Sequence, residues 1–391
     1  MQFGSFLTIS NVFYILFVFV PIAIILDVFF SIDNTILFIL SVLALIPLAK
    51  LVGDTTEHLA EHYGNTGGSL INITFSNTPE IILSIVAIQV GLFDLVKANI
   101  VGSILGQLLL VFGLSLIVGG LRFKEQIFNL RNIRFHIALL FMSITILSIP
   151  TILSLGNLTA TESDGENALN SNTFMTFVLS NFFAILFIII YILSLIFTFK
   201  THSSLFSSQL SSSNETNIES FIGFRDETKV AGKTDSFQLW SKKKSVGLLA
   251  ISMIGITIIS QILVSNVEET ISTFNLGVLF VGAIVIGIVG NVPEKITSMM
   301  MARKGKLDLA VGIAASSASQ IALFVFPVII IAAMMLGTSF PLIFTPFELI
   351  ALFSSIFLLY FVTNSGKGNW FQGTILVGFF IAIALGFYFI K

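Results

Sequence analysis

The chain has 391 residues, of which 55% are hydrophobic and only 10% are charged, and its formal net charge is −2. A soluble domain carries about 25% charged residues, so this chain has too little charge to cover a surface that faces water. It is therefore predicted to be an all-α integral membrane protein whose partner is the lipid bilayer. The absence of cysteine excludes a disulfide framework and thiol chemistry, and the small net charge argues against a nucleic-acid partner.

Apolar runs long enough to cross a bilayer, roughly 20 residues each, follow one another along most of the chain. One polar segment interrupts them at 200–244, which is rich in Ser, Asn and charge and is predicted to be a flexible or partly ordered loop. Eleven spans are predicted, near 12–31, 35–56, 67–90, 95–119, 133–154, 173–199, 245–265, 274–300, 307–336, 346–363 and 370–390.

Basic residues in the connecting loops predict the orientation, because cytoplasmic loops carry an excess of Lys and Arg. Loops on the same side as the N-terminus hold fifteen of them, and the opposite side holds Lys97 and the terminal Lys391. The N-terminus and the 200–244 loop are therefore predicted to be cytoplasmic, with the C-terminus on the other side of the membrane. A microbial plasma membrane is the favoured location, and an organelle membrane is the alternative.

The chain also contains an internal repeat. FSNTPEIILSIVAIQVGLFDLVKANIVGS (75–103) aligns without a gap with VGNVPEKITSMMMARKGKLDLAVGIAASS (289–317), at a constant offset of 214 residues. The matched positions include scarce residue types: Asn77 with Asn291, Pro79 with Pro293, Glu80 with Glu294, Gly91 with Gly305, Asp94 with Asp308 and Ser103 with Ser317.

The repeat predicts an inverted architecture. Its copies fall in the third and eighth spans, five spans apart, so they must cross the membrane in opposite directions. Inverted repeats are typical of secondary transporters, whose substrate sites form near the midplane on broken helices. The predicted organisation is an N-terminal helix (1–32), a first five-helix repeat (33–199), the 200–244 loop and a second, inverted five-helix repeat (245–391).

The paired motifs predict a cation site. Asn77 and Glu80 are three residues apart, as are Asn291 and Glu294, so each pair shares one helix face. Pro79 and Pro293 remove backbone hydrogen bonds and free carbonyl oxygens, which are tolerated at membrane depth only in a cavity or against a ligand. Two carboxylates, two amides and free carbonyls form an all-oxygen set, which hard divalent cations such as Ca²⁺ prefer.

The same site predicts exchange. Two like charges 4 Å apart repel by about 4 kcal/mol at an effective dielectric of 20, and burial penalises each charge further. One divalent cation or two protons relieve this repulsion, so the pair is expected to titrate as a coupled unit. If only the neutralised forms reorient, the protein is an obligate cation/proton exchanger. A purely structural role suits a lone buried glutamate better than two at symmetric positions.

Other polar residues within the spans allow two interpretations. Ser103 and Gln107 share a face of the fourth span, and Ser317 and Gln320 lie at corresponding positions of the ninth. They either complete the cation site or form hydrogen bonds between helices. Glu57, near the end of the second span, is a candidate acid on the access path.

These residues resemble a known family. The passages GGSLINITFSNTPEIILSIVAIQVGLFDLVKANIVGSILGQLLLVFG and GNVPEKITSMMMARKGKLDLAVGIAASSASQIALFVFPVII resemble the two α-repeats of the cation/proton exchanger family, the Ca²⁺/H⁺ antiporter branch of the Ca²⁺/cation antiporter superfamily. The tail GKGNWFQGTILVGFFIAIALGF resembles its last span, and the likeness covers most of 40–120 and 270–390, with α-motifs at 65–119 and 277–336.

The resemblance implies one extra helix plus two inverted five-helix repeats, and proton-driven export of Ca²⁺, sometimes extended to Mn²⁺ or other divalent cations. The transported ions are then Ca²⁺ and H⁺, with no cofactor and no enzymatic activity. The residues that match the family's functional positions are Glu80 and Glu294 as the metal-binding acids, Asn77, Asn291, Glu57, Ser317 and Gln320.

Three positions depart from the family pattern. Ser76 stands where the family usually has Gly, Gln107 where it usually has Asn, and Lys295 where it usually has His. Lys295 follows the site acid Glu294 directly, so its charge either weakens divalent binding, changes the proton coupling, or reaches toward the cytoplasm.

Three other functions are alternatives to the exchanger. A sodium-driven exchanger of the same superfamily differs in depending on a sodium gradient rather than a pH gradient. A cation channel lined by Glu80 and Glu294 is disfavoured, because channels usually place such acids in rings built from several subunits. A membrane-embedded enzyme is disfavoured because the spans contain no His-rich or Ser/Lys cluster.

Overall fold

A computed structural model describes residue 13 and residues 15–30, 32–160, 165–202 and 240–390. The predicted loop at 200–244 and the start of the first predicted span fall largely outside these residues. The chain divides into two compact units: the first comprises Met1–Val86, Ser207–Asn275 and Val289–Glu294, and the second comprises Ala87–Phe206, Leu276–Ile288 and Lys295–Lys391.

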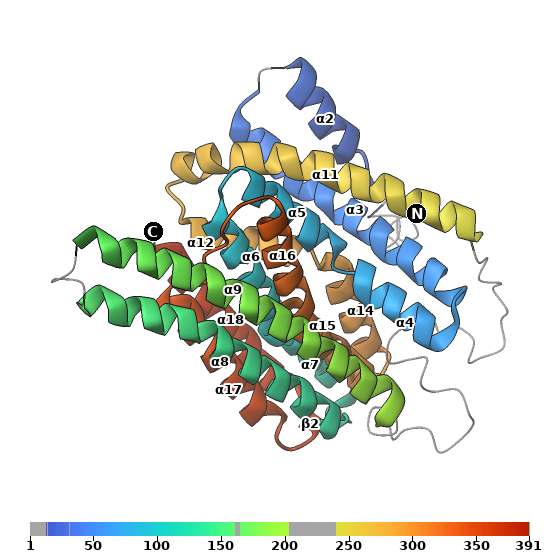
Figure 1. Cartoon of the computed structure of the whole chain (residues 1–391). Helices are drawn as coiled ribbons and strands as arrows, with labels where there is room; N and C mark the ends of the chain where they lie inside the picture. The colour runs from blue at the N-terminus through green and yellow to red at the C-terminus, as the bar shows by residue number, and fades with distance from the viewer. Residues whose placement is uncertain (1–12, 14, 31, 161–164, 203–239, 391) are drawn as a thin grey trace. The chain divides into compact units, whose positions relative to one another are not determined.

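The described residues are almost entirely helical (Figure 1). Four short segments, labelled η, are wider π-helical turns within longer helices or, for η2, at the end of one. The elements are α2 (Phe19–Phe29), α3 (Asn34–Glu61), α4 (Gly64–Phe75), α5 (Thr78–Gln89), α6 (Phe93–Leu105), η1 (Gly106–Val111), α7 (Phe112–Phe123), β1 (Gln126–Ile127), α8 (Leu130–Ala160), α9 (Gly165–Ile196), η2 (Phe197–Thr201), α11 (Lys242–Thr273), α12 (Val278–Phe280), η3 (Val281–Ile286), α13 (Gly287–Val289), α14 (Val292–Arg303), α15 (Leu307–Gln320), η4 (Ile321–Val325), α16 (Phe326–Met335), α17 (Pro346–Thr363), β2 (Lys367–Gly368) and α18 (Trp370–Phe389).

Eight helices among the described residues are long and apolar enough to cross a membrane, and a ninth span results if the bent pair Val278–Val289 and Val292–Arg303 is counted as one. The two segments of that pair meet at an angle of 59°. Two shorter apolar helices, α2 and α5, lie where the first and third spans are predicted. The all-helical membrane class is thus confirmed, whereas the total of eleven spans stays a prediction.

In the first unit, α3 packs against α2, α4 and α11, and α3 and α11 lie side by side along most of their length (Figure 1). Hydrogen bonds join this antiparallel pair at both ends. Asn34, at the start of α3, donates to Glu269 near the end of α11. At the opposite end, the ring of His62 is 2.8 Å from the carbonyl oxygen of Trp240, which precedes α11.

The centre of the second unit is the continuous span formed by α6, η1 and α7. In its most apolar stretch 83% of the residues are buried, against 22% for the span at Val178–Thr201 on α9 and η2. The central span packs against η3, α15, α17 and α18. Its polar residues must therefore find partners on these neighbouring helices.

The loops that connect the helices of the second unit form two groups, one at each end of the unit. At one end, β1 and β2 form a two-residue antiparallel ladder, a feature that helical periodicity does not predict because each strand is only two residues long. Further hydrogen bonds join the same connections: Arg122 to the carbonyl of Arg303, the Asn129 N–H to the Asp308 carboxylate, and Arg134 to Asn364.

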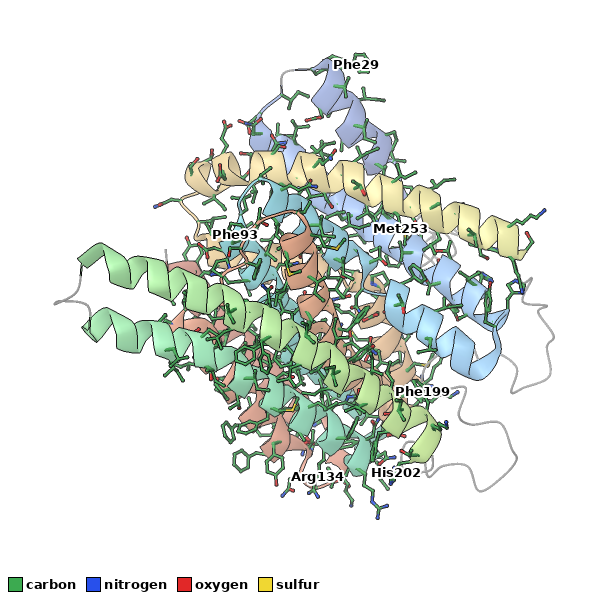
Figure 2. All side chains as sticks on the ribbon, in the orientation of Figure 1. Phe29, Phe93, Arg134, Phe199, His202 and Met253 are labelled. Carbon is green, nitrogen blue, oxygen red and sulfur yellow. The ribbon has the colours of Figure 1, made fainter. Side chains whose placement is uncertain are left out.

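The second group lies at the opposite end. Lys97, near the start of α6, donates to the carbonyl oxygen of Ile343 at 2.7 Å, and the Phe344 N–H donates to Thr151. Figure 2 shows Arg134 and His202 at one end of this unit and Phe93 toward the other. Helices α6 and α15, which correspond in the repeat, therefore begin at opposite ends of the second unit.

The turns that precede α6 and α15 have the same backbone geometry. Gly91 and Gly305, which are equivalent in the repeat, both have φ of 83°, a conformation that glycine adopts without a steric penalty. The N–H of Gly91 donates to Ile88 and that of Leu92 to Ala87; the N–H of Gly305 donates to Ala302 and that of Lys306 to Met301. The helices before both turns end in this Schellman-type pattern, so the repeat extends to backbone hydrogen bonding.

Candidate cation site

Both copies of the Asn-x-Pro-Glu motif lie at a break between two helices. Residues 76–77 separate α4 from α5, and residues 290–291 separate α13 from α14. Pro79 and Pro293 are the second residues of α5 and α14, where the missing N–H is not needed by the helix that follows. The missing N–H would otherwise bond to the last carbonyl of the preceding helix, at Phe75 or Val289. The prolines therefore separate the helices at equivalent positions.

The breaks place a carboxylate in the first turn of each following helix. Glu80 is the third residue of α5 and Glu294 is the third residue of α14. A negative charge is favoured there by the unpaired N–H groups and the positive end of the helix dipole. The helices themselves thus help to hold two acids within apolar spans.

The first unit brings the two motifs together. Glu80 is 3% exposed, and its carboxylate lies against the backbone of Gly290, next to Asn291. A Cβ atom built on Gly290 would overlap Glu80 Oε1 and lie 3.1 Å from Cδ. Only glycine leaves room for the carboxylate in this position, so Gly290 is a site residue that sequence reasoning missed. Its place in the helix break was the available signal.

The two asparagines are both buried at the breaks. Asn77 Nδ2 donates to Ser76 Oγ at 3.3 Å, whereas Asn291 Nδ2 has no hydrogen-bond partner among the described residues. A buried amide without a partner is costly, and a rotated amide presents an oxygen to a cation instead. Asn291 therefore has the chemistry expected of a ligand.

The other two candidate acids in the first unit, Glu57 and Glu294, are less buried than Glu80. Glu294 is half-buried at the start of α14, and Glu57 is half-buried one turn before the end of α3. Helix α3 packs on α4, which ends at the first break. The first unit thus contains all five of the motif and access-path residues: Glu57, Asn77, Glu80, Asn291 and Glu294.

The other four predicted site residues belong to the second unit. Gln107 is fully buried in η1 and donates from Nε2 to Ser317 Oγ on α15 at 3.0 Å. Ser103 donates to the carbonyl oxygen of Gly287 at 3.4 Å, and Gln320 is half-buried at the end of α15. The bond from Gln107 to Ser317 joins the two repeats, and a place for these residues in the cation site stays a prediction.

Lys295 lies against the backbone of the broken span. Its side chain is buried in the second unit and donates to two backbone carbonyl oxygens of the broken span, those of Gly287, 3.3 Å away, and Ile288. The first of these oxygens is the one that Ser103 also contacts. The effects of Lys295 on divalent binding and on proton coupling, and its direction relative to the cytoplasm, stay predictions.

Comparison with known proteins agrees with these features. The model of the family described as sodium/calcium exchanger protein matches residues 34–200 and 244–389, so the fold and the paired motifs belong to a family of membrane cation exchangers. The chain is a member of this sodium/calcium exchanger protein family.

Relatives within the family are similar over nearly the whole chain. The chain is 35% identical to the Ca²⁺/H⁺ antiporter of Aphanothece halophytica over 381 residues, 97% of each protein. It is also 35% identical to the Ca²⁺/H⁺ antiporter ChaA of Bacillus subtilis (strain 168) over 356 residues, 91% of this chain and 92% of ChaA.

Solved structures share the fold. The structure of native YfkE superposes with a TM-score of 0.75 at 31% identity, covering 96% of this chain and 99% of that one. The H⁺/Ca²⁺ exchanger CAX has a TM-score of 0.65 at 14% identity, covering 97% of this chain and 89% of that one, which establishes likeness of fold alone.

Proposed function

We propose that this protein exchanges cytosolic Ca²⁺ for protons across a membrane as a secondary transporter, with Ca²⁺ and H⁺ as transported ions and without a cofactor. Membership of the exchanger family and similarity to Ca²⁺/H⁺ antiporters over almost the entire length support the proposal. The observation that carries the mechanism is the buried Glu80 carboxylate lying against Gly290, the residue that precedes Asn291 of the second motif in the chain.

In the proposed mechanism, Glu80 and Glu294 bind either one divalent cation or protons. Asn77 and Asn291 supply amide oxygens, and the carbonyls left at the helix breaks complete an oxygen-rich set that suits Ca²⁺. A doubly ionised pair without a cation is penalised within the bilayer, so the carrier reorients only when cation or protons neutralise the pair. Ca²⁺ and protons therefore compete for one site and move in opposite directions.

Secondary roles are proposed for the other polar residues. Glu57 is assigned to the access path that leads to the acids. Ser103, Gln107, Ser317 and Gln320 are proposed to belong to the cation pathway, and the bond between Gln107 and Ser317 fixes two of these side chains for that role.

We also propose the complete topology: eleven spans, consisting of one N-terminal helix (1–32) and two inverted five-helix repeats (33–199 and 245–391). The opposite starting ends of α6 and α15 within the second unit support the inversion. The connections rich in Arg and Lys, around 122–134, 303–308 and 364–367, gather at one end of this unit, which supports assigning them together to the cytoplasmic side. The N-terminus is then cytoplasmic and the C-terminus lies across the membrane, in a microbial plasma membrane or in an organelle.

Uptake of radiolabelled Ca²⁺ into proteoliposomes tests the function. An imposed pH gradient is expected to drive uptake by the wild type, and collapse of the gradient with a protonophore is expected to stop it. Uptake that responds to a sodium gradient but not to a pH gradient would instead indicate the sodium-coupled exchanger. Passive flux far above carrier rates would indicate a channel.

A further inference from the structure

Lys295 is a buried cation on the broken span of the second repeat. Its side chain is 6% exposed, and its ammonium donates to the carbonyl oxygens of Gly287, at 3.3 Å, and Ile288. The end of the side chain lies along η1, because a Cβ atom built on Gly106 would be 3.7 Å from Nζ. All of these groups belong to the second unit.

The two carbonyl oxygens lie where a helix ends. Helix α13 stops at Val289, and the last four carbonyls of a helix have no partner within it. They also form the negative end of the helix dipole, which attracts cations. In transporters with broken helices, such carbonyl ends are the groups that bind Na⁺.

One of these oxygens has a second polar neighbour in the same unit. The carbonyl of Gly287 also accepts a hydrogen bond from Ser103 Oγ at 3.4 Å, and Glu294 immediately precedes Lys295 in the chain. The ammonium thus occupies an oxygen-lined position next in sequence to a proposed cation-binding acid. It carries the charge of one alkali cation and is covalently attached.

We propose that Lys295 is a built-in monovalent cation that determines ion specificity: its ammonium fills the position at the Gly287 and Ile288 carbonyls and thereby excludes Na⁺ and K⁺ from the exchange cycle. This inference rests on the proposed Ca²⁺/H⁺ exchange and adds which ions cannot take part. Removal of the ammonium leaves the two oxygens to a diffusible alkali cation, which then competes with Ca²⁺ and protons.

Lys97 provides a control that distinguishes this proposed role from the simple capping of a backbone carbonyl. Lys97 is 7% exposed and also donates to a backbone carbonyl, that of Ile343 at 2.7 Å, and its ammonium forms an ion pair with Asp94 at 2.7 Å. It lies at the end of the second unit rather than at a helix break. Lys97→Met is therefore the matched control for Lys295→Met, since both remove a buried ammonium from a carbonyl and replace it with an apolar side chain of similar length.

The first experiment measures competition in the wild type, Lys295→Met and Lys97→Met. Proteoliposomes take up radiolabelled Ca²⁺ under a fixed pH gradient while NaCl or KCl replaces choline chloride at constant ionic strength. The salt concentration that halves uptake is expected to fall about tenfold or more in Lys295→Met, equivalent to about 1.4 kcal/mol or more, and to stay at the wild-type value in Lys97→Met. An unchanged value in Lys295→Met would overturn the proposal.

The second experiment does not depend on transport. The thermal unfolding midpoint of each purified protein in detergent is measured in NaCl, KCl and choline chloride, because an ion that binds the folded state raises the midpoint. Na⁺ or K⁺ is expected to stabilise Lys295→Met but neither the wild type nor Lys97→Met. Equal salt responses in all three proteins would refute the inference even if Lys295→Met fails to transport. Absence of Ca²⁺ transport by the wild type would count against the proposed function but would not change the outcome of the salt-dependent unfolding measurement.

Discussion

The two copies of the Asn-x-Pro-Glu motif share one backbone plan and differ in their side-chain surroundings. In both, a two-residue break precedes a helix whose second residue is proline and whose third is glutamate. The first copy holds the more deeply buried acid, Glu80, whereas the second supplies the glycine backbone against which it lies and the lysine that caps its own broken helix. A repeated sequence can thus keep the geometry of a break while the copies take different parts in one site.

The largest expected effect comes from removing either acid. Glu80→Gln and Glu294→Gln each delete one of the two negative charges that are proposed to attract Ca²⁺. Loss of one partner of a buried charge interaction costs about 2–5 kcal/mol, which corresponds to a roughly 30-fold to several thousand-fold loss of affinity. Gradient-driven Ca²⁺ uptake is expected to be lost in both variants, at matched protein levels. Normal uptake by the double variant would show that the acids do not carry the ion.

The second-largest effect is expected from disturbing the contact between Glu80 of the first motif and Gly290 of the second. Gly290→Ala places a methyl group where Glu80 Oε1 lies, and overpacking of this kind costs typically about 1–3 kcal/mol. Ca²⁺ uptake at low concentration is expected to fall several-fold or more. Gly53→Ala is the matched control, because a Cβ atom on that glycine of α3 meets nothing within 4 Å. Equal uptake by the two variants would contradict the close approach of Glu80 to Gly290.

The equivalent turns at Gly91 and Gly305 can be compared by their contributions to thermal stability. Gly91→Ala and Gly305→Ala both force a side chain into a left-handed conformation at φ of 83°, which costs about 1–2 kcal/mol. Gly305→Ala is expected to lower the thermal midpoint further, because its methyl group would lie 3.1 Å from Phe123 whereas that of Gly91→Ala meets nothing within 4 Å. Two unchanged midpoints would argue against the shared turn.

The smallest effect is expected from the hydrogen bond that joins the copies in the second unit. Ser317→Ala removes the acceptor of the bond from Gln107, and such bonds within membranes contribute about 0.6 kcal/mol on average. If the bond only joins helices, stability falls slightly and the Ca²⁺ concentration for half-maximal uptake stays constant. A several-fold rise in that concentration, with stability nearly unchanged, would support the proposed role in the cation pathway.

The features that depend on scarce residue types are predictable from the sequence. The spacing of Asn, Pro and Glu is sufficient to predict both helix breaks, and apolar length is sufficient for most helices. The contact of Glu80 with Gly290 is not predictable, because glycine in an apolar helix is common and only the folded chain shows what approaches it. The direction of the long Lys295 side chain and the short β1–β2 ladder likewise depend on tertiary neighbours rather than on local pattern.

The contact of Glu80 with Gly290 also has a consequence for how the protein is made. More than half of the chain separates the two residues, and at about 5–20 residues per second the first motif is complete roughly ten to forty seconds before its counterpart leaves the ribosome. During that interval the helices α4 and α5, each of 12 residues, are individually too short for a bilayer core of about 30 Å. They must therefore enter the membrane as one unit while carrying an acid whose final surroundings do not yet exist. In the proposed exchange cycle Glu80 binds a proton, and the same protonation would keep this acid neutral until its partner arrives.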